Sequence, residues 1–396
     1  MSDAEPGPSP APGRAPRSPS LADALRATPL PGADAARTRA WALLSDAHAS
    51  RVPVLRTRRR GRVIALAFAV VLAGAAVAFA ADSPRWVRSV LGTVPSPRPV
   101  RVSMGSLPAG RLLVSSSHGT WIVRGDGTRL RLGPWTAATW SPRGLYVAAW
   151  RGHELSAVAP DGRVAWTVAA PGIVHDARWS PDGYRIAYRR AGGLAVIAGD
   201  GTGPRVLAAS ARPVAPAWRP GAPHTLAWVG ARGHVEVRDV DTGRLAWRSA
   251  ASVGAVRELQ WSADGRRLLA RGERRLLVLD VHGNRVRRFH LARAARVTAA
   301  AWAPHGRRLA IALRAGRTSR VVVTRSTRVP THSTFAAPGT LTSLAWSPDA
   351  TRLLVRWRES DQWLLLPTTG SARATAIADV SRRFGASPAV QGWCCS

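Results

Sequence analysis

Lysine is absent from this chain of 396 residues, and acidic residues are scarce, with 23 aspartates and glutamates against 57 arginines. Abundant alanine, glycine and proline indicate GC-rich coding, which explains the choice of arginine over lysine. Acidic residues also have GC-rich codons, so coding bias does not explain the formal net charge of +34. Such an excess favours anionic partners.

Cysteine is nearly absent too. The two cysteines, Cys394 and Cys395, are adjacent in the terminal segment QGWCCS. This arrangement excludes the disulfide framework of small secreted domains, which needs several bridges between spaced positions. Neighbours in a strand point to opposite faces, so we expect these two to be poorly placed to bond each other. One would face the interior and the other outward, and an intermolecular disulfide or a soft-metal site is the alternative.

Motifs of common catalytic and metal sites are missing. The chain contains no G-x-S-x-G, no H-E-x-x-H, no phosphate-binding glycine loop and no cysteine–histidine cluster at metal-ligand spacing. Its 10 histidines are scattered. The sequence therefore predicts no catalytic residue, no metal and no cofactor, and a hydrolase is the least favoured class of function.

Only one long apolar run is present, at residues 63–81, with 19 positions and no charge. This length can cross a hydrocarbon layer of about 30 Å as a helix. Five arginines lie within residues 56–62, so the positive-inside rule predicts a single transmembrane helix with a cytoplasmic N-terminus. Secretion after cleavage near Ala80 is the alternative. Residues 82–104 are predicted to form an interfacial helix and a proline-rich linker.

Residues 1–62 would then form a cytoplasmic tail. Its first 20 residues are rich in proline, serine and alanine, which predicts disorder. Short helical patterns follow within residues 21–50, and one of them carries an amphipathic stripe of Trp41, Leu44 and His48. This stripe is either a docking surface for a cytoplasmic regulator or part of a marginal helix that precedes the membrane segment.

Downstream, one phrase recurs six times, in the form TWSPRGLYVAAW at its first appearance. Its tryptophans recur every 39 to 44 residues, at Trp140, Trp179, Trp218, Trp261, Trp302 and Trp346. Further runs of β-forming residues follow each phrase, with a turn rich in glycine or aspartate between them. Each unit is therefore predicted to be a four-stranded meander, and repetition of such units around an axis builds a β-propeller.

The recurring phrase resembles the repeat of TolB-type, WD-like propellers across residues 105–396. Three units keep the turn aspartate of that family, at Asp182, Asp264 and Asp349. Arg143 and His305 replace it in two units, and the third unit reads WRPGAP. The resemblance implies an all-β propeller domain that mostly binds other proteins, although a fold does not by itself determine function.

The two ends of the propeller region complement each other. Residues 110–132 supply three strands and a turn, but no tryptophan-bearing first strand. Trp393 stands at the tryptophan position of a seventh unit. We therefore predict seven blades, the last completed by the C-terminal strand, with six or eight blades as alternatives. Residues 100–104 are a competitor for the same edge.

First strands line the central channel of a propeller, and most of them are small and apolar here. Two carry polar residues that are candidates for a binding site at the channel mouth, namely His175, Asp176, Arg257, Glu258 and Gln260. The alternative is that these groups only hydrate the channel. The seven motif tryptophans are predicted to be structural, as aromatic plates between neighbouring blades.

Most of the charge excess lies beyond the tail. Residues 1–62 hold 11 arginines and 5 acidic residues, whereas the remainder holds 46 and 18. An extracytoplasmic propeller with this charge favours phospholipid headgroups, teichoic-type polymers or acidic proteins, and its compartment argues against nucleic acid. The predicted function is a binding or scaffolding module in the cell envelope. The alternative is transmembrane signalling, with residues 21–50 holding a regulator as in anti-sigma proteins.

Overall fold

The computed structural model describes residues 96–395, apart from 290, 292, 325–329, 370–372 and 387, and apart from the side chains of 330–333. The cytoplasmic tail, the transmembrane segment and most of the linker that the sequence predicts lie outside these residues. No helix within the described part of the chain is long and apolar enough to cross a membrane.

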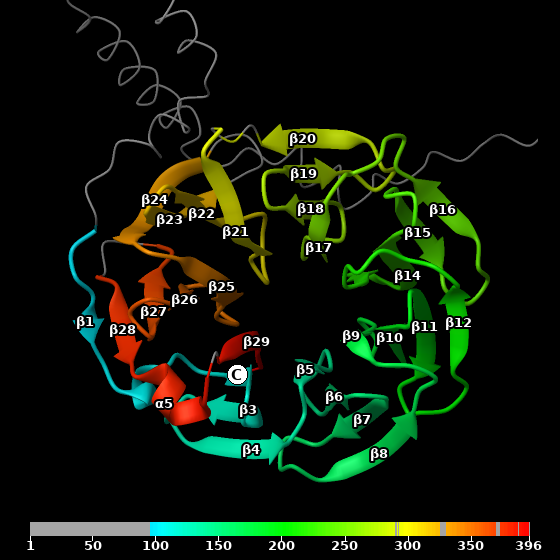
Figure 1. The fold of residues 1–396 in the computed structure, drawn as a ribbon, viewed down its shortest axis with the longest axis horizontal. Coiled ribbons are helices and arrows are strands. Elements are labelled where there is room, and N and C mark those ends of the chain that lie inside the picture. The colour runs from blue at the N-terminus through cyan, green and yellow to red at the C-terminus, as the bar shows by residue number, and fades with distance from the viewer. Residues whose placement is uncertain are drawn as a thin grey trace, which may run out of the picture. The chain divides into compact units, whose positions relative to one another are not determined.

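The described strands form seven sheets arranged in a ring, which is a seven-bladed β-propeller (Figure 1). We number the blades along the chain and give the strands of each from the channel outward. Blade 1 contains β29 (Ala389–Cys394), β2 (Arg111–Ser116), β3 (Gly119–Arg124) and β4 (Arg129–Gly133). Blade 2 contains β5 (Ala137–Trp140), β6 (Val147–Arg151), β7 (Glu154–Val158) and β8 (Val164–Ala169). Blade 3 contains β9 (His175–Trp179), β10 (Arg185–Arg190), β11 (Gly193–Ala198) and β12 (Arg205–Ala208).

The remaining four blades repeat this order. Blade 4 contains β13 (Ala217–Arg219), β14 (Ala222–Val229), β15 (Val235–Asp239) and β16 (Leu245–Arg248). Blade 5 contains β17 (Val256–Trp261), β18 (Leu268–Gly272), β19 (Leu276–Leu279) and β20 (Arg285–Phe289). Blade 6 contains β21 (Ala295–Trp302), β22 (Leu309–Ala315), β23 (Thr318–Thr324) and β24 (Pro330–Pro338). Blade 7 contains β25 (Leu341–Trp346), β26 (Arg352–Trp357), β27 (Gln362–Pro367) and β28 (Thr375–Ala378).

Hydrogen bonds within the recurring phrase explain why it makes a tight turn. In blade 3, Ser180 Oγ donates to Asp182 Oδ1 at 2.5 Å and accepts the backbone N–H of Arg185 at 3.0 Å. Gly183 adopts a φ of +81°, which a residue without Cβ accommodates without strain. The serine–aspartate bond recurs in blades 5 and 7, so the phrase predicted its hairpins for a physical reason.

The motif tryptophans lie where they were predicted, near the ends of the innermost strands. Five of them are buried, with at most 9% of the residue exposed. Three donate their indole N–H to a carbonyl of the preceding blade: Trp218 to Arg178 at 2.8 Å, Trp261 to Ala217 at 3.1 Å and Trp346 to Ala301 at 3.0 Å. The tryptophans therefore join neighbouring blades by apolar packing, and those of blades 4, 5 and 7 add a hydrogen bond.

The C-terminal strand closes the ring, as the sequence predicted. Strand β29 pairs antiparallel with β2, and Trp393 lies opposite Leu112. A short strand, β1 (Val100–Arg101), instead pairs in parallel with β28 at the outer edge of blade 7. The proposed competition of residues 100–104 for the edge of blade 1 was therefore wrong.

The adjacent cysteines were also interpreted wrongly. Cys394 and Cys395 form a disulfide with each other. Strand β29 ends at Cys394, and Cys395 adopts a φ of +48° in the left-handed region. Because the second cysteine has already left the strand, the alternation of side chains along a strand does not apply to it.

The propeller has two faces. The motif face carries the turns that follow the motif tryptophans, and the loop face carries the connections between blades.

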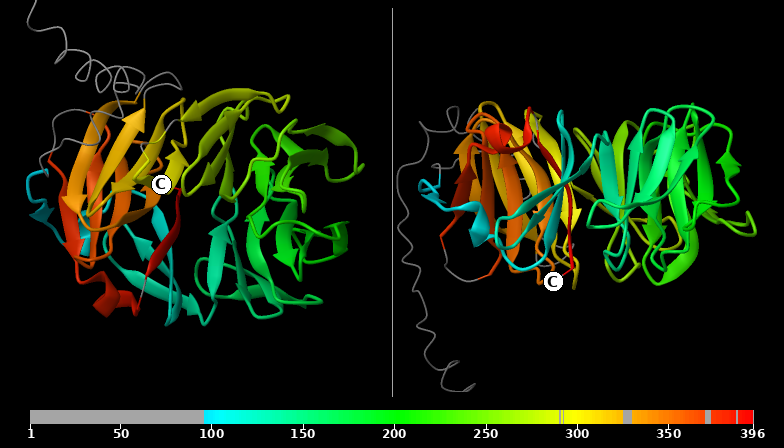
Figure 2. Two further views of the ribbon diagram at one scale, coloured as in Figure 1. Left: turned by 45° about the horizontal axis from the view of Figure 1, so that its top comes forward. Right: turned by 90° about the horizontal axis from the view of Figure 1, so that it is seen from below.

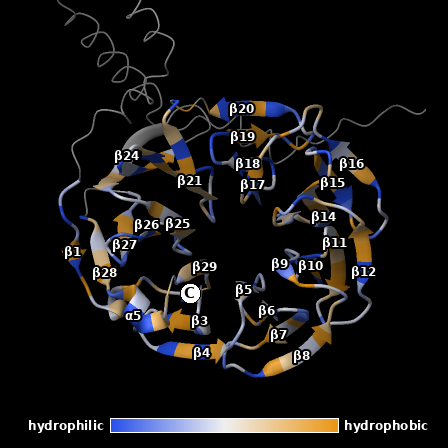
Figure 3. Ribbon diagram, in the orientation of Figure 1, coloured by the Kyte–Doolittle hydropathy of each residue, from blue (hydrophilic) through white to orange (hydrophobic). Residues whose placement is uncertain are grey.

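Figure 2 shows the ring from the side, and Figure 3 shows hydrophobic stretches on strands of every blade. The core consists of such strands packed between blades; in β26, for example, Leu353, Leu354 and Val355 are fully buried.

Candidate functional site

Two of the predicted channel residues form equivalent ion pairs in blades 3 and 5. Asp176 accepts a hydrogen bond from Arg189 Nε at 2.7 Å, and Glu258 accepts one from Arg271 Nε at 2.7 Å. Each acid lies three residues before a motif tryptophan, and each arginine lies ten residues after it. The side chains of these acids are about one third exposed, so they remain reachable although each is neutralised within its own blade.

A third charged residue, Arg178 on β9, belongs to the same region. Burial lowers the pKa of Arg178, and the charges of Asp176 and Glu258 oppose this shift. Both predicted acids therefore act on one cation, although they come from blades 3 and 5. Arg178 directly precedes its motif tryptophan, as the predicted residue Gln260 does in blade 5, but Arg178 was not among the residues predicted from the sequence.

The other predicted channel residues do not join this group. His175 is exposed at the start of β9. Arg257 forms an exposed ion pair with Glu273 at 3.2 Å. Gln260 Oε1 accepts the backbone N–H of Trp302 at 3.0 Å, which links blade 5 to blade 6. We therefore assign Gln260 a structural role, and the binding role of the channel residues stays a prediction.

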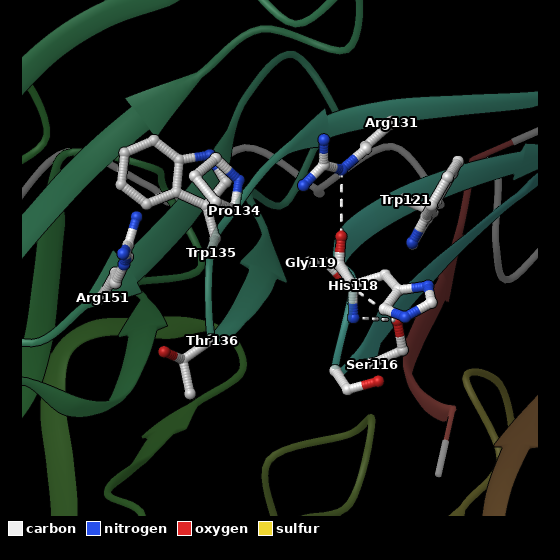
Figure 4. A pocket seen from close by; sticks show the side chains of 10 residues that line it. Ser116, His118, Gly119, Trp121, Arg131, Pro134, Trp135, Thr136 and Arg151 are labelled. Atoms are coloured by element: carbon white, nitrogen blue, oxygen red, sulfur yellow. Dashed lines mark hydrogen bonds between the residues drawn. The ribbon is translucent and has the colours of Figure 1, made fainter. Parts of the chain in front are cut away.

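A pocket of about 760 Å³ lies between blades 1 and 2 on the loop face, and no pattern in the sequence indicates it (Figure 4). Its lining comes from the β2–β3 hairpin, strands β3, β4 and β6, and the β4–β5 loop. The residues that matter for its chemistry are His118, Trp121, Arg131, Pro134, Trp135 and Arg151. No repeat or motif connects them, because they come from several separate segments.

Hydrogen bonds hold the walls of this pocket in place. Arg131 Nε donates to the carbonyl of His118 at 2.9 Å, and Thr120 Oγ1 donates to the carbonyl of Trp135 at 3.1 Å. Gly133 has a φ of +152°, and a Cβ there would lie 2.8 Å from the indole nitrogen of Trp135. The close approach of this indole to the backbone therefore requires glycine.

A second cavity, of about 770 Å³, lies on the motif face. Blades 1, 2, 6 and 7 contribute to its lining, which includes Cys394, Cys395, Trp140, Pro304, His305 and Pro348. Arg111 lies beside it, donating to the carbonyl of Gly144 at 3.1 Å and standing over the ring of Trp140. The segment QGWC thus both closes the ring and lines a cavity at its surface.

Acidic side chains of the propeller are largely engaged in local structure. A hydrogen bond from Thr128 lowers the pKa of Asp126, and one from Thr202 does the same for Asp200. Asp241 accepts hydrogen bonds from Arg185 and lies in an ion pair with Arg205. Such acids neutralise little of the arginine excess beyond their own neighbourhood.

Comparison with known proteins supports the fold. No protein-family model matches the chain, and a search of curated proteins found no match. The β-propeller domain of Myceliophteria thermophila Cps50 (Swd1) is 15% identical over 70% of this chain and 99% of that one, with a TM-score of 0.55. The C-terminal WD40 domain of Sif2 is 14% identical over 69% of this chain and 82% of that one, with a TM-score of 0.51. Identities this low show the WD40-like propeller fold alone.

Proposed function

We propose that this chain is a membrane-anchored binding module whose propeller, outside the cytoplasm, holds acidic proteins or anionic polymers of the cell envelope. The apolar segment at 63–81 would be the anchor. A WD40-like propeller offers two faces and a channel for binding. The proposal names no reaction, because the chain lacks the motifs of catalytic sites described above.

The observation that carries this proposal is the excess of arginines over acidic residues. Acidic side chains of the propeller cap turns, as Asp126 and Asp200 do, or pair with arginines, as Glu236 does with Arg238 and Arg248. Residues 63–396 contain 46 arginines and only 18 acids, so many arginines have no acid to pair with. A surface with this excess attracts polyanions at long range, and salt screens the attraction.

The test uses the full chain in nanodiscs of neutral lipid, with polyglutamate as the anionic probe and dextran as the uncharged control. We expect polyglutamate to bind and its apparent affinity to fall steeply between about 50 mM and about 500 mM NaCl, because the Debye length shortens. Dextran should not bind. Equal binding of the two polymers, or affinity for polyglutamate that salt does not change, would contradict the proposal.

Placement of the propeller outside the cytoplasm needs a separate test. Intact cells that express the full chain with an epitope tag inserted in the 160–163 hairpin should bind antibody without permeabilisation, whereas a tag at residue 5 should need it. Labelling of both tags only after permeabilisation would contradict the topology.

A second candidate function, transmembrane signalling, is favoured by the amphipathic stripe of Trp41, Leu44 and His48 on the other side of the apolar segment. In this function the tail holds a regulator such as a sigma factor. A sigma factor that copurifies with the full chain should be lost from the double variant Trp41→Asp, Leu44→Asp. Its equal retention by that variant would exclude the stripe as the docking surface.

A further inference from the structure

The pocket between blades 1 and 2 gathers hydrogen-bond donors but no acidic side chain. Arg131 uses its Nε to bind the carbonyl of His118, and its two Nη atoms have no partner within the described residues. The guanidinium of Arg151 makes no hydrogen bond or ion pair with any described residue. Each of these two guanidinium groups lines the opening and is suited to a carboxylate or a phosphate, whose oxygens accept charge-assisted hydrogen bonds.

The rest of the pocket provides an apolar surface beside these cations. In the view of Figure 4, Arg131 lies between the indoles of Trp135 and Trp121, and Pro134 lies next to Trp135. An indole packs well against the C–H face of a sugar ring, which is apolar, whereas the hydroxyls of the ring need polar partners. Thr136 offers such a hydroxyl at the exposed mouth of the pocket. The lining therefore suits a polar ring that carries an anionic group.

Blade 4 provides an internal comparison. Its hairpin between the second and third strands and its outermost strand line a cavity of about 540 Å³, which extends toward the preceding blade rather than the following one. Arg248 lies there opposite Glu236 on the neighbouring strand, just as Arg131 lies opposite Trp121 in blade 1. Glu236 accepts a hydrogen bond from Arg248 Nη2 at 3.0 Å, so the chain itself supplies the anion in blade 4. In blade 1 an indole replaces that carboxylate, and the arginine faces the pocket without one.

We propose that the pocket between blades 1 and 2 binds a sugar ring that carries a carboxylate or a phosphate. Arg131 or Arg151 would bind the anionic group, and the indole of Trp135 or Trp121 would pack against the ring. This inference rests on the proposed function and gives it a ligand class, an acidic glycan or sugar phosphate. Its test is independent of polyglutamate binding, so the two can fail separately.

The experiment is isothermal titration of the full chain in uncharged detergent. One arm uses trigalacturonate and its neutral methyl ester, which have the same rings, and the other uses glucose 6-phosphate and glucose. We expect at least one anionic ligand to bind at least about tenfold more tightly than its neutral counterpart, since a hydrogen bond between charged groups contributes about one order of magnitude or more. The arm that responds identifies carboxylate or phosphate as the recognised group.

Three variants locate the binding. Arg151→Gln removes one guanidinium that has no described partner, and Trp121→Glu recreates the ion pair of blade 4 beside Arg131. Each should weaken binding about tenfold or more. Arg248→Gln removes the equivalent arginine of blade 4 and should leave affinity unchanged. Trp121 also packs against Phe384, so Arg151→Gln is the variant whose effect does not depend on folding.

Each result decides the inference. Tighter binding of an anionic sugar that Arg151→Gln weakens and Arg248→Gln preserves would support it. Equal affinity for the charged and neutral ligands, or unchanged affinity in both Arg151→Gln and Trp121→Glu, would overturn it. The absence of binding by both anionic sugars up to about 10 mM would overturn it as well. Polyglutamate binding that persists in any of these cases would leave the proposed function standing without this pocket.

Discussion

Ser343 in blade 7 occupies the position at which blades 3 and 5 have the acidic residue of an ion pair. It lies three residues before Trp346, where blades 3 and 5 have Asp176 and Glu258. Ser343 and Asp176 share a φ of +52°. Arg356 stands at the position of the paired arginines, but its buried Nε has no hydrogen-bond partner among the residues that the structure describes. Burial lowers the pKa of Arg356, the nearby charge of Arg358 adds to this shift, and the charge of Asp361 opposes it. Blade 7 therefore keeps the cation of the pair without its acid.

Ser343→Asp should restore the missing pair. We expect the free energy of unfolding to rise by about 1 kcal/mol, because a buried donor gains a charged acceptor. Aspartate tolerates the left-handed backbone at this position better than most residues. Urea unfolding checks the prediction against Ser343→Asn, which has a similar shape but no charge. A stability of Ser343→Asp no greater than that of the asparagine variant would be evidence against it.

Asp349 gives a residue-scale prediction with a pH dependence. Hydrogen bonds from the Ser347 hydroxyl and the Thr351 backbone lower its pKa. The contribution of its carboxylate to stability is thus complete above the unfolded pKa of about 3.9 and is lost as pH falls through the lower folded value. Asp349→Ala should therefore destabilise the chain at pH 7, and its deficit should shrink below about pH 4. A deficit that is constant from pH 7 to pH 3 would refute this origin.

At the scale of elements, β29 is the strand on which ring closure depends. It covers the inner edge of β2 and brings Trp393 into the core around Leu112 and Phe384. Removal of this strand would expose apolar surface and leave the backbone groups of β2 without partners. The single strand therefore connects the first and last parts of the propeller.

Deletion of residues 388–396 should lower the free energy of unfolding by about 3 kcal/mol or more, the scale of a lost buried aromatic residue. The control is Cys394→Ser with Cys395→Ser, which keeps the strand and removes only the disulfide. Chemical denaturation followed by circular dichroism measures both variants. A truncated chain that unfolds at the same urea concentration as the intact one would disprove closure by β29.

The elements also show why some features were predictable from the sequence and others were not. The inner strands and their turns follow from a local phrase whose tryptophan, serine and aspartate contact one another or the neighbouring blade. Closure of the ring by β29 was predictable because Trp393 stands at the tryptophan position of a seventh repeat. The pocket between blades 1 and 2 was not predictable, because side chains such as Arg131 and Arg151 come together only when two blades pack. The position of β1 likewise depends on an edge that forms only in the folded ring.

For the whole molecule, the dominant electrostatic feature is like-charge repulsion. The formal net charge is +34, and the ion pairs of the propeller are mostly partly exposed, where each contributes little. We therefore expect the melting temperature of the propeller to rise between about 20 mM and about 200 mM NaCl, since screening relieves repulsion more than it weakens ion pairs. Differential scanning calorimetry of the full chain tests this. A melting temperature that falls over the same range would show that ion pairs outweigh repulsion.

Because β29 pairs with β2, blade 1 can be completed only after the rest of the propeller has been synthesised. The ribosome makes β2 before blades 2–7 and β29 after them. The inner edge of β2 therefore has no partner strand while blades 2–7 are synthesised. During that interval the edge is available to any other extended segment, including β29 of a neighbouring nascent chain. Closely spaced ribosomes on one messenger RNA would therefore favour exchange of β29 between neighbouring chains, and fast completion of each chain would reduce this exchange.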